Sequence, residues 1–177
     1  MRKPNHLLYS PAMPRQTDNA ATFRALVLSP VKFRLFMLSR LPMAYMAGLR
    51  VSAITPALAT VRVPYKYLNK NPFRSIYFAC LSMAAELSTG VLCMMQVYKS
   101  VPAISMLVVR MEADFTKKSV GTIAFTCHDG AAIAAAAERT KATGEGVTVT
   151  ATSIGVDESG DQVATFRFTW SLKAKRK

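Results

Sequence analysis

Cysteine and histidine are scarce in this chain. The three cysteines, at positions 80, 93 and 127, form no Cys-x-x-Cys pair, and the two histidines stand at positions 6 and 128. An odd number of dispersed thiols favours free cysteines in a reducing compartment over a disulfide framework. The same dispersal does not match the ligand spacing of a zinc site. We therefore predict no metal and no other cofactor, and a cytoplasmic location.

Acidic residues are also few, with 10 Asp and Glu against 23 Lys and Arg, and the formal net charge is +13. Such a balance favours acidic partners: nucleic acid, anionic lipid, phosphate-bearing cofactors or an acidic carrier protein. The basic residues form no glycine-rich or aromatic-interleaved stretch, however, so nucleic acid binding is not expected. The one dense run, "KAKRK" at residues 173–177, is typical of a solvated terminus.

The sequence also lacks a signal-like segment, internal repeats and low-complexity linkers. Its first 19 residues contain no apolar core of signal-peptide length, so secretion is not expected. About half of the 177 residues (51 %) are apolar, which is enough for the core of one compact domain. We predict a mostly helical N-terminal extension over residues 1–47, packed on a domain of residues 48–177 that ends in the basic tail.

Helix signals divide the extension into short pieces. Ser29 followed by Pro30 is a helix start, Pro42 should end or kink that helix, and Gly48 is suited to a helix stop. The resulting helix is amphipathic and basic. Packing across the domain and peripheral contact with a membrane both fit this pattern.

The hydrophobic period then predicts the order of the remaining elements. Two short strands are expected within residues 49–68, a helix from Ser75, its possible cap, to about residue 98, and two strands within residues 103–129. A short helix from Asp129 to Gly144 and a hairpin with its tip at residues 157–161 complete the chain. The long helix is apolar on all sides, so the strands must wrap around it in an α+β fold.

The same helix carries a single carboxylate, Glu86. Polar residues interrupt the apolar run often enough to favour a buried core helix over a transmembrane one. Burying an unpaired carboxylate costs several kcal/mol or raises its pKa, and no basic residue shares its helical face. One interpretation is a carboxylate satisfied by hydrogen bonds from another strand or a partner subunit. The other is a general base or nucleophile whose environment tunes its pKa.

Around Glu86 the sequence resembles the hot-dog-fold thioesterases, in particular an uncharacterised branch similar to the PaaI-type and 4-hydroxybenzoyl-CoA-type enzymes. A typical member has an Asn, a Gly-Ser/Thr-Ile/Val-His-x-Gly opening and then a helix carrying Asp or Glu. Here Asn71 takes the first position, "SIYFA" the helix opening, and "LSMAAELSTG" the segment with the acid. The resemblance covers roughly residues 45 to 173. It implies a hot-dog fold, an antiparallel sheet wrapped around a long central helix, and a homodimer or dimer of dimers with the site at the subunit interface.

The resemblance also implies roles for individual residues. Glu86 falls on the catalytic acid, backbone N–H groups near Phe78 and Ala79 would hold an oxyanion, and Tyr77 stands where many members have His. Asn71 and either Ser82 or Thr89 would position water or substrate. The sequence departs from the family where Arg74 and Phe78 replace small glycines. A basic cluster before the helix consists of Arg62, Lys66, Lys70 and Arg74. It is either ordinary surface charge or a cationic mouth that would attract coenzyme A phosphates or an acidic carrier protein.

Three functions are therefore open. The first is hydrolysis of an acyl thioester of coenzyme A or acyl carrier protein, as the resemblance implies. The second is a non-catalytic protein of the same fold that binds an acyl chain or another lipid. The third is peripheral membrane binding through the helices of residues 20 to 47.

Overall fold

The computed structural model describes residues 16–175 of the chain, and its elements follow the order expected from the sequence. The described residues form six helical segments and six strands, in this order: α1 (Gln16–Leu28), α2 (Pro30–Arg40), α3 (Pro42–Ala47), β1 (Arg50–Ile54), β2 (Ala59–Pro64), η1 (Tyr67–Asn69), α4 (Phe78–Val97), β3 (Ile104–Phe115), β4 (Thr122–Cys127), α5 (Gly130–Thr143), β5 (Val147–Val156) and β6 (Gln162–Ala174).

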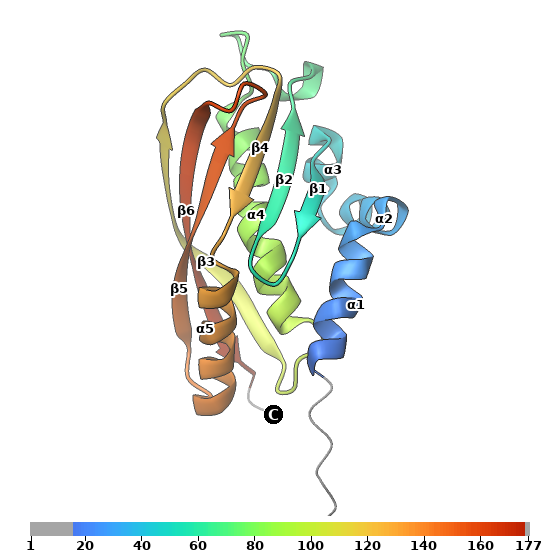
Figure 1. Ribbon diagram of the computed structural model, residues 1–177, viewed down its shortest axis with the longest axis vertical. Coiled ribbons are helices and arrows are strands. Elements are labelled where there is room, and N and C mark those ends of the chain that lie inside the picture. Colours follow the sequence, from blue (N-terminus) through green and yellow to red (C-terminus); the bar gives the residue numbers. More distant parts are fainter. Residues whose placement is uncertain (1–15, 176–177) are drawn as a thin grey trace, which may run out of the picture.

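The strands form one antiparallel sheet in the order β1-β2-β4-β5-β6-β3. Helix α4 lies along one face of this sheet, and α5 packs on β5 beside it (Figure 1). Most of α4 is buried, although it is the one described helix that is long and apolar enough to cross a membrane. The predicted hot-dog arrangement, a sheet wrapped around a central helix, is therefore confirmed, and α4 is a core helix.

Alternating burial along the strands explains why the sheet has one covered face. In β6, four apolar side chains point toward α4 and are buried, namely Phe166, Phe168, Trp170 and Leu172. The residues between them face the other side, where hydroxyl pairs such as Thr150 and Thr169 join neighbouring strands. Phe168 and Trp170 thus belong to the core, because alternate side chains of a strand lie on the same face of its sheet.

The N-terminal helices begin and end where proline and glycine predict. Ser29 is the N-cap of α2 with Pro30 as its first residue, Pro42 opens α3, and Gly48 ends α3 in the left-handed conformation (φ 76°). Buried side chains of α1 and α2, including Phe23 and Phe33, join the same core as the sheet and α4. The division into an extension and a domain at residues 47 and 48 stays a prediction.

The start of α4 differs from the expectation that Ser75 caps it. Tyr77 is the N-cap, because residues 71–75 form a tight turn with Arg74 in the left-handed region (φ 57°). Asn69, which is fully buried, fixes this start to its surroundings. Its backbone carbonyl accepts the Tyr77 N–H at 2.6 Å, and its Nδ2 donates to the carbonyls of Ala47 (2.8 Å) and Pro64 (2.7 Å).

We predict that Asn69→Ala lowers the free energy of unfolding by about 2–4 kcal/mol, because two buried carbonyls lose their donor. Urea unfolding measures the change. Asn19→Ala is the matched control, since Asn19 makes one exposed hydrogen bond to the carbonyl of Lys99, and its loss should stay below about 1 kcal/mol. Equal effects of the two substitutions would contradict the role assigned to Asn69.

Candidate active site

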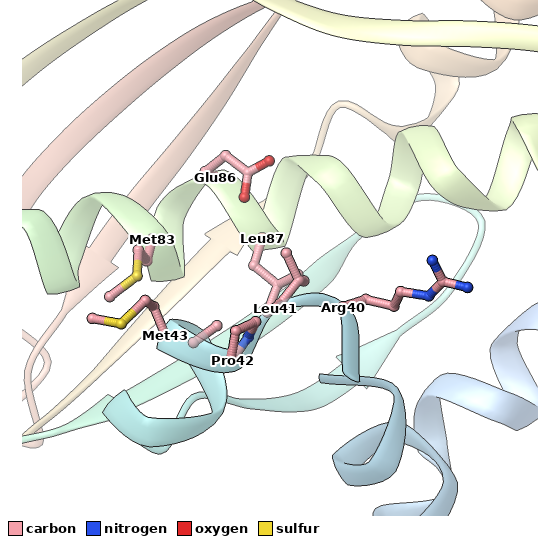
Figure 2. Close-up of a pocket in the computed structure, with 8 residues that line it drawn as sticks. Arg40, Leu41, Pro42, Met43, Met83, Glu86 and Leu87 are labelled. Carbon is pink, nitrogen blue, oxygen red and sulfur yellow. The ribbon is translucent and has the colours of Figure 1, made fainter. Parts of the chain in front are cut away.

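Glu86 lies in the middle of α4, where a pocket of about 250 Å³ opens between this helix and the corner joining α2 to α3. The pocket is lined mainly by apolar side chains, and Figure 2 shows Met83 and Leu87 of α4 facing Leu41, Pro42 and Met43. Its other lining residues are Arg40 and Ala44. Helix α4 thus presents its only carboxylate at the edge of an apolar hollow.

No described residue donates a hydrogen bond to the Glu86 carboxylate or forms an ion pair with it. Arg40, the cation that lines the pocket, extends away from it (Figure 2). A Cβ added to Gly90, one turn further along, would lie 3.2 Å from Glu86 Oε1 and 3.4 Å from the ring of Trp170. The glycine therefore leaves room for the carboxylate beside the indole. Burial raises the pKa of Glu86 from its ordinary value to about 7.

A second pocket, of about 330 Å³, lies at the start of α4. Tyr77 and Phe78 line it, and their rings meet edge to face at 4.8 Å with about half of each side chain exposed. The N–H groups of Phe78 and Ala79 have no acceptor among the described residues, because they belong to the first turn of the helix. The Tyr77 N–H is bonded to Asn69, so only the two later amides are free for an oxyanion.

Asn71 also lines the second pocket, but its side chain is engaged in the turn before the helix. Its Oδ1 accepts the N–H groups of Phe73 (3.0 Å) and Ser75 (3.2 Å) and the Ser75 hydroxyl (3.2 Å). Its Nδ2 lies 3.5 Å from the carbonyl of Ile76. Asn71 therefore holds the loop that opens α4, and the direct role predicted for it in catalysis stays a prediction.

Ser82 and Thr89 flank Glu86 along α4, yet their environments differ. The Thr89 hydroxyl is buried, donates to the Glu86 carbonyl at 2.9 Å and accepts the Trp170 Nε1–H at 3.0 Å. It positions the turn that carries Glu86 and has no hydrogen left to donate to a substrate. Ser82 is half-buried, and its hydroxyl makes no hydrogen bond within the described residues.

The basic cluster expected before the helix is dispersed in the structure. Arg62 lies exposed on β2, in register with Arg50 and Ala124 and on the face of the sheet away from α4. Lys66 reaches the backbone at Gly48, and Lys70 lies over the Tyr67 ring at 4.3 Å. Arg74 is exposed in the turn, outside the lining of the second pocket.

Two other cations, Lys117 and Lys118, line the second pocket. The loop after β3 reaches the helix start because the Ile76 N–H donates to the Ser119 carbonyl at 2.8 Å. Lys117 forms ion pairs with Asp157 (2.6 Å) and Asp161 (2.7 Å), which leaves Lys118 as the less constrained charge. The adjacent lysines are visible in the sequence, but their place beside α4 depends on this long-range contact.

Metal chemistry has no support among the side chains that the structure describes. They contain no group of three or more His, Cys, Asp or Glu placed to hold an ion. All three cysteines are buried. Glu86, the free amides of Phe78 and Ala79, and Lys118 are the groups with chemistry to offer, and they are divided between two pockets.

Comparison with protein families matches residues 31–172 to a domain of unknown function, DUF4442. The chain belongs to the DUF4442 family. No curated protein matches it. The match begins in α2 and ends in β6, so it includes both pockets described above.

Solved structures with the same fold include three from bacteria. A probable thioesterase of unknown function from Pseudomonas aeruginosa is 21 % identical, with a TM-score of 0.69 over 82 % of this chain and 97 % of that one. A putative thioesterase from Shewanella oneidensis is 10 % identical, with a TM-score of 0.66 over 88 % of this chain and 99 % of that one. The E. coli PaaI protein, from the phenylacetic acid degradation operon, is 14 % identical, with a TM-score of 0.59 over 91 % of this chain and 96 % of that one. The TM-scores establish the shared hot-dog fold, and at such low sequence identity they show the fold alone.

The raised pKa predicts an effect of Glu86 on stability. The folded state holds this proton more tightly than the unfolded state, so the stability it contributes is lost as the pH rises toward 7. Glu86→Gln removes the ionisation. We expect it to raise the free energy of unfolding by about 1–3 kcal/mol at pH 8, and to leave it nearly unchanged at pH 4.

Urea unfolding at both pH values measures this difference. Glu112→Gln is the control, because Glu112 is an exposed carboxylate on β3 that forms an ion pair with Arg110, so no gain at pH 8 is expected. A destabilising Glu86→Gln at pH 8 would mean that the carboxylate has a stabilising partner after all.

Proposed function

We propose that the protein is a thioesterase that hydrolyses an acyl thioester of coenzyme A or acyl carrier protein, with Glu86 as its catalytic base. One observation carries this proposal: a carboxylate with a pKa of about 7 and no partner among the described residues stands at the wall of an apolar pocket. A group with that pKa is divided between its base and acid forms at neutral pH, which is what general base catalysis needs.

The geometry favours a site that is shared between two copies of the chain. Phe78 and Glu86 are eight residues apart on one helix, which separates them by about 12 Å along its axis. The attacking water must lie within about 3 Å of the Glu86 carboxylate, and the oxygen of the attacked carbonyl must lie within about 3 Å of the N–H groups. A homodimer whose α4 helices lie side by side in opposite directions would place the first-turn amides of one chain near Glu86 of the other.

Strand β3 supports such a dimer because it is a sheet edge with exposed apolar residues. Met111 and Phe115 are in register with the buried Phe168 and Ala164, so they face the helix side of the sheet, yet 45 % and 51 % of them is exposed. An unpaired edge of 12 residues is a template for pairing with another strand. Pairing between two β3 strands would cover it and bring the two α4 helices together.

The reaction follows from these groups. The Glu86 carboxylate takes a proton from water as the water oxygen attacks the thioester carbonyl. The N–H groups of Phe78 and Ala79 from the other chain stabilise the resulting oxyanion. The C–S bond then breaks, and the thiolate leaves with the proton that Glu86 received, which yields a carboxylic acid and a free thiol. Direct attack of the carboxylate on the carbonyl is the alternative route.

The two pockets suit the two parts of an acyl thioester. The apolar pocket beside Glu86 fits an acyl chain, with Met83 and Met43 as adaptable walls, and a fatty acyl group is the substrate we propose. Lys118, at the helix start, suits the phosphates of coenzyme A or an acidic carrier. We place this activity in the cytoplasm, in keeping with the dispersed thiols.

Binding without hydrolysis is the second candidate, and Phe78 favours it. Its half-exposed ring stands at the helix start, where the thioester carbonyl has to approach. If the ring excludes that carbonyl, the pocket beside Glu86 holds an acyl chain without chemistry. Native mass spectrometry of the purified protein would then find a retained fatty ligand and kinetic assays no turnover.

An assay with acyl-CoA substrates of increasing chain length tests the enzyme proposal. Glu86→Gln should lower kcat/KM at least 100-fold, because removal of a general base typically has an effect of about 10²–10⁴. Glu145→Gln, in the exposed loop after α5 and away from β3, should retain wild-type activity. Absence of turnover at every chain length would count against hydrolysis, and so would an active Glu86→Gln variant.

The pH profile is a separate prediction. Because the base form of Glu86 is required and its pKa is about 7, kcat/KM should rise about tenfold per pH unit below 7 and reach a plateau above 8. Initial rates between pH 5 and 9, corrected for spontaneous hydrolysis, measure the profile. A rate that is flat across neutral pH would exclude Glu86 as the titrating base.

A further inference from the structure

Charge is distributed unevenly along the chain. Residues 19–85 contain no Asp or Glu at all, but they contain nine basic residues: Arg24, Lys32, Arg34, Arg40, Arg50, Arg62, Lys66, Lys70 and Arg74. The carboxylates therefore all lie elsewhere in the chain, and the acid-free segment includes α2 and α3 entirely. A segment with this charge has a strong preference for anionic surfaces.

Helix α2 is apolar on its inner and its outer side. Phe33 and Met37 are buried against the core, as expected for a packed helix. On the opposite side Val31, Leu35 and Leu38, spaced four and three residues apart, are 69 %, 61 % and 51 % exposed. Packing among residues 16–175 gives no reason for this outer stripe, because a surface helix normally carries polar residues there.

Exposed apolar residues also lie in the elements next to α2, and cations border the stripe. Leu28 before the helix and Met43 and Met46 of α3 are about half exposed or more. At helical spacing Lys32 and Arg34 stand on either side of the stripe, and Arg34 is held against Tyr45 by a cation–π contact at 5.2 Å. We call this surface the α2 patch: Leu28, Val31, Leu35, Leu38, Met43 and Met46, with Lys32 and Arg34.

The proposed dimer does not cover the α2 patch. Strand β3 is one edge of the sheet and β1 is the other, and α1 packs beside β1. Figure 1 shows α1, α2 and α3 together on the β1 side, away from β3. Two copies joined through β3 would therefore leave both α2 patches uncovered, and no described residue covers them within one chain.

We propose that the α2 patch binds the surface of a lipid bilayer that contains anionic headgroups. The apolar stripe enters the boundary between headgroups and acyl chains, while Lys32 and Arg34 contact lipid phosphates, as in helices that lie in the plane of a membrane. A nucleic acid would use the cations but leave the leucines exposed to water. A bilayer uses both features, and this choice does not depend on the proposed thioesterase activity.

Vesicle flotation with the full chain tests the proposal. We expect the protein to float with phosphatidylcholine vesicles that contain about 30 % phosphatidylglycerol, and much less with phosphatidylcholine alone. Raising the salt from about 0.15 M to about 0.5 M should weaken the binding, because exposed charges are screened. Failure to float with anionic vesicles overturns the proposal, and this measurement needs no variant.

Two pairs of substitutions separate the two features of the patch. Lys32→Glu with Arg34→Glu should lower the vesicle partition coefficient about tenfold or more, and Leu35→Ser with Leu38→Ser should do the same. The matched controls are Arg139→Glu with Lys173→Glu, and Leu68→Ser with Ile154→Ser, all exposed and outside the patch. Both controls should stay within about twofold of wild type.

The alternative occupants give different results. If the charge reversal weakens binding and the leucine pair does not, the surface is a general polyanion site and the proposal is wrong. If the Leu35→Ser, Leu38→Ser variant forms a smaller oligomer in light scattering and the wild type does not float with vesicles, the patch joins copies of the chain. That result also overturns the proposal. Acyl-CoA hydrolysis without vesicles is measured on the same samples, so a failure of either proposal leaves the other intact.

Discussion

The Glu86 carboxylate sits in the core helix without a hydrogen-bond donor among the described residues. The proposed chemistry depends on this unpaired carboxylate. Ionising it there is unfavourable, and its pKa of about 7 expresses that penalty. The surrounding described residues keep the carboxylate partly buried and unpaired. Gly90 leaves room beside the carboxylate, and Thr89 and Trp170 fix the backbone of the same turn. Arg40, the cation that lines the pocket, extends away from it and forms no ion pair with Glu86.

The surfaces of the molecule divide accordingly. The start of α4 has the free amides and the middle of α4 has the Glu86 carboxylate, so the proposed site between two chains would combine groups that one chain keeps apart. The exposed apolar edge at β3 suits that contact, and the α2 patch lies beside the opposite edge of the sheet, near β1. In the proposed assembly, one apolar surface meets a second copy and the other meets lipid.

Local patterns were enough to predict the fold and the position of the acid. Period-two strands, the Ser29-Pro30 start and the single carboxylate of α4 depend on short-range physics that the sequence shows directly. Contacts between distant segments were not predictable in this way. The side of the sheet that carries Arg62, the approach of Lys118 to α4 and the buried bonds of Asn69 all depend on register and loop paths. The structure therefore separates Arg62 from the start of α4, and the binding role predicted for it stays a prediction, while Glu86 lines a pocket.

A complementation experiment tests the shared site most directly. Phe78→Pro removes one oxyanion N–H and keeps the helix, because Phe78 is the first helical residue and Tyr77 before it is extended (ψ 133°). Each of Phe78→Pro and Glu86→Gln alone should be nearly inactive. Co-expressed with two tags, they form hybrid dimers in which one site has Glu86 from one chain and the Phe78 amide from the other. A site shared between two chains predicts that purified hybrids recover about half of the wild-type acyl-CoA turnover, because one of their two sites is intact. If the wild-type protein is active but the hybrids are as inactive as the two single variants, the shared site is wrong.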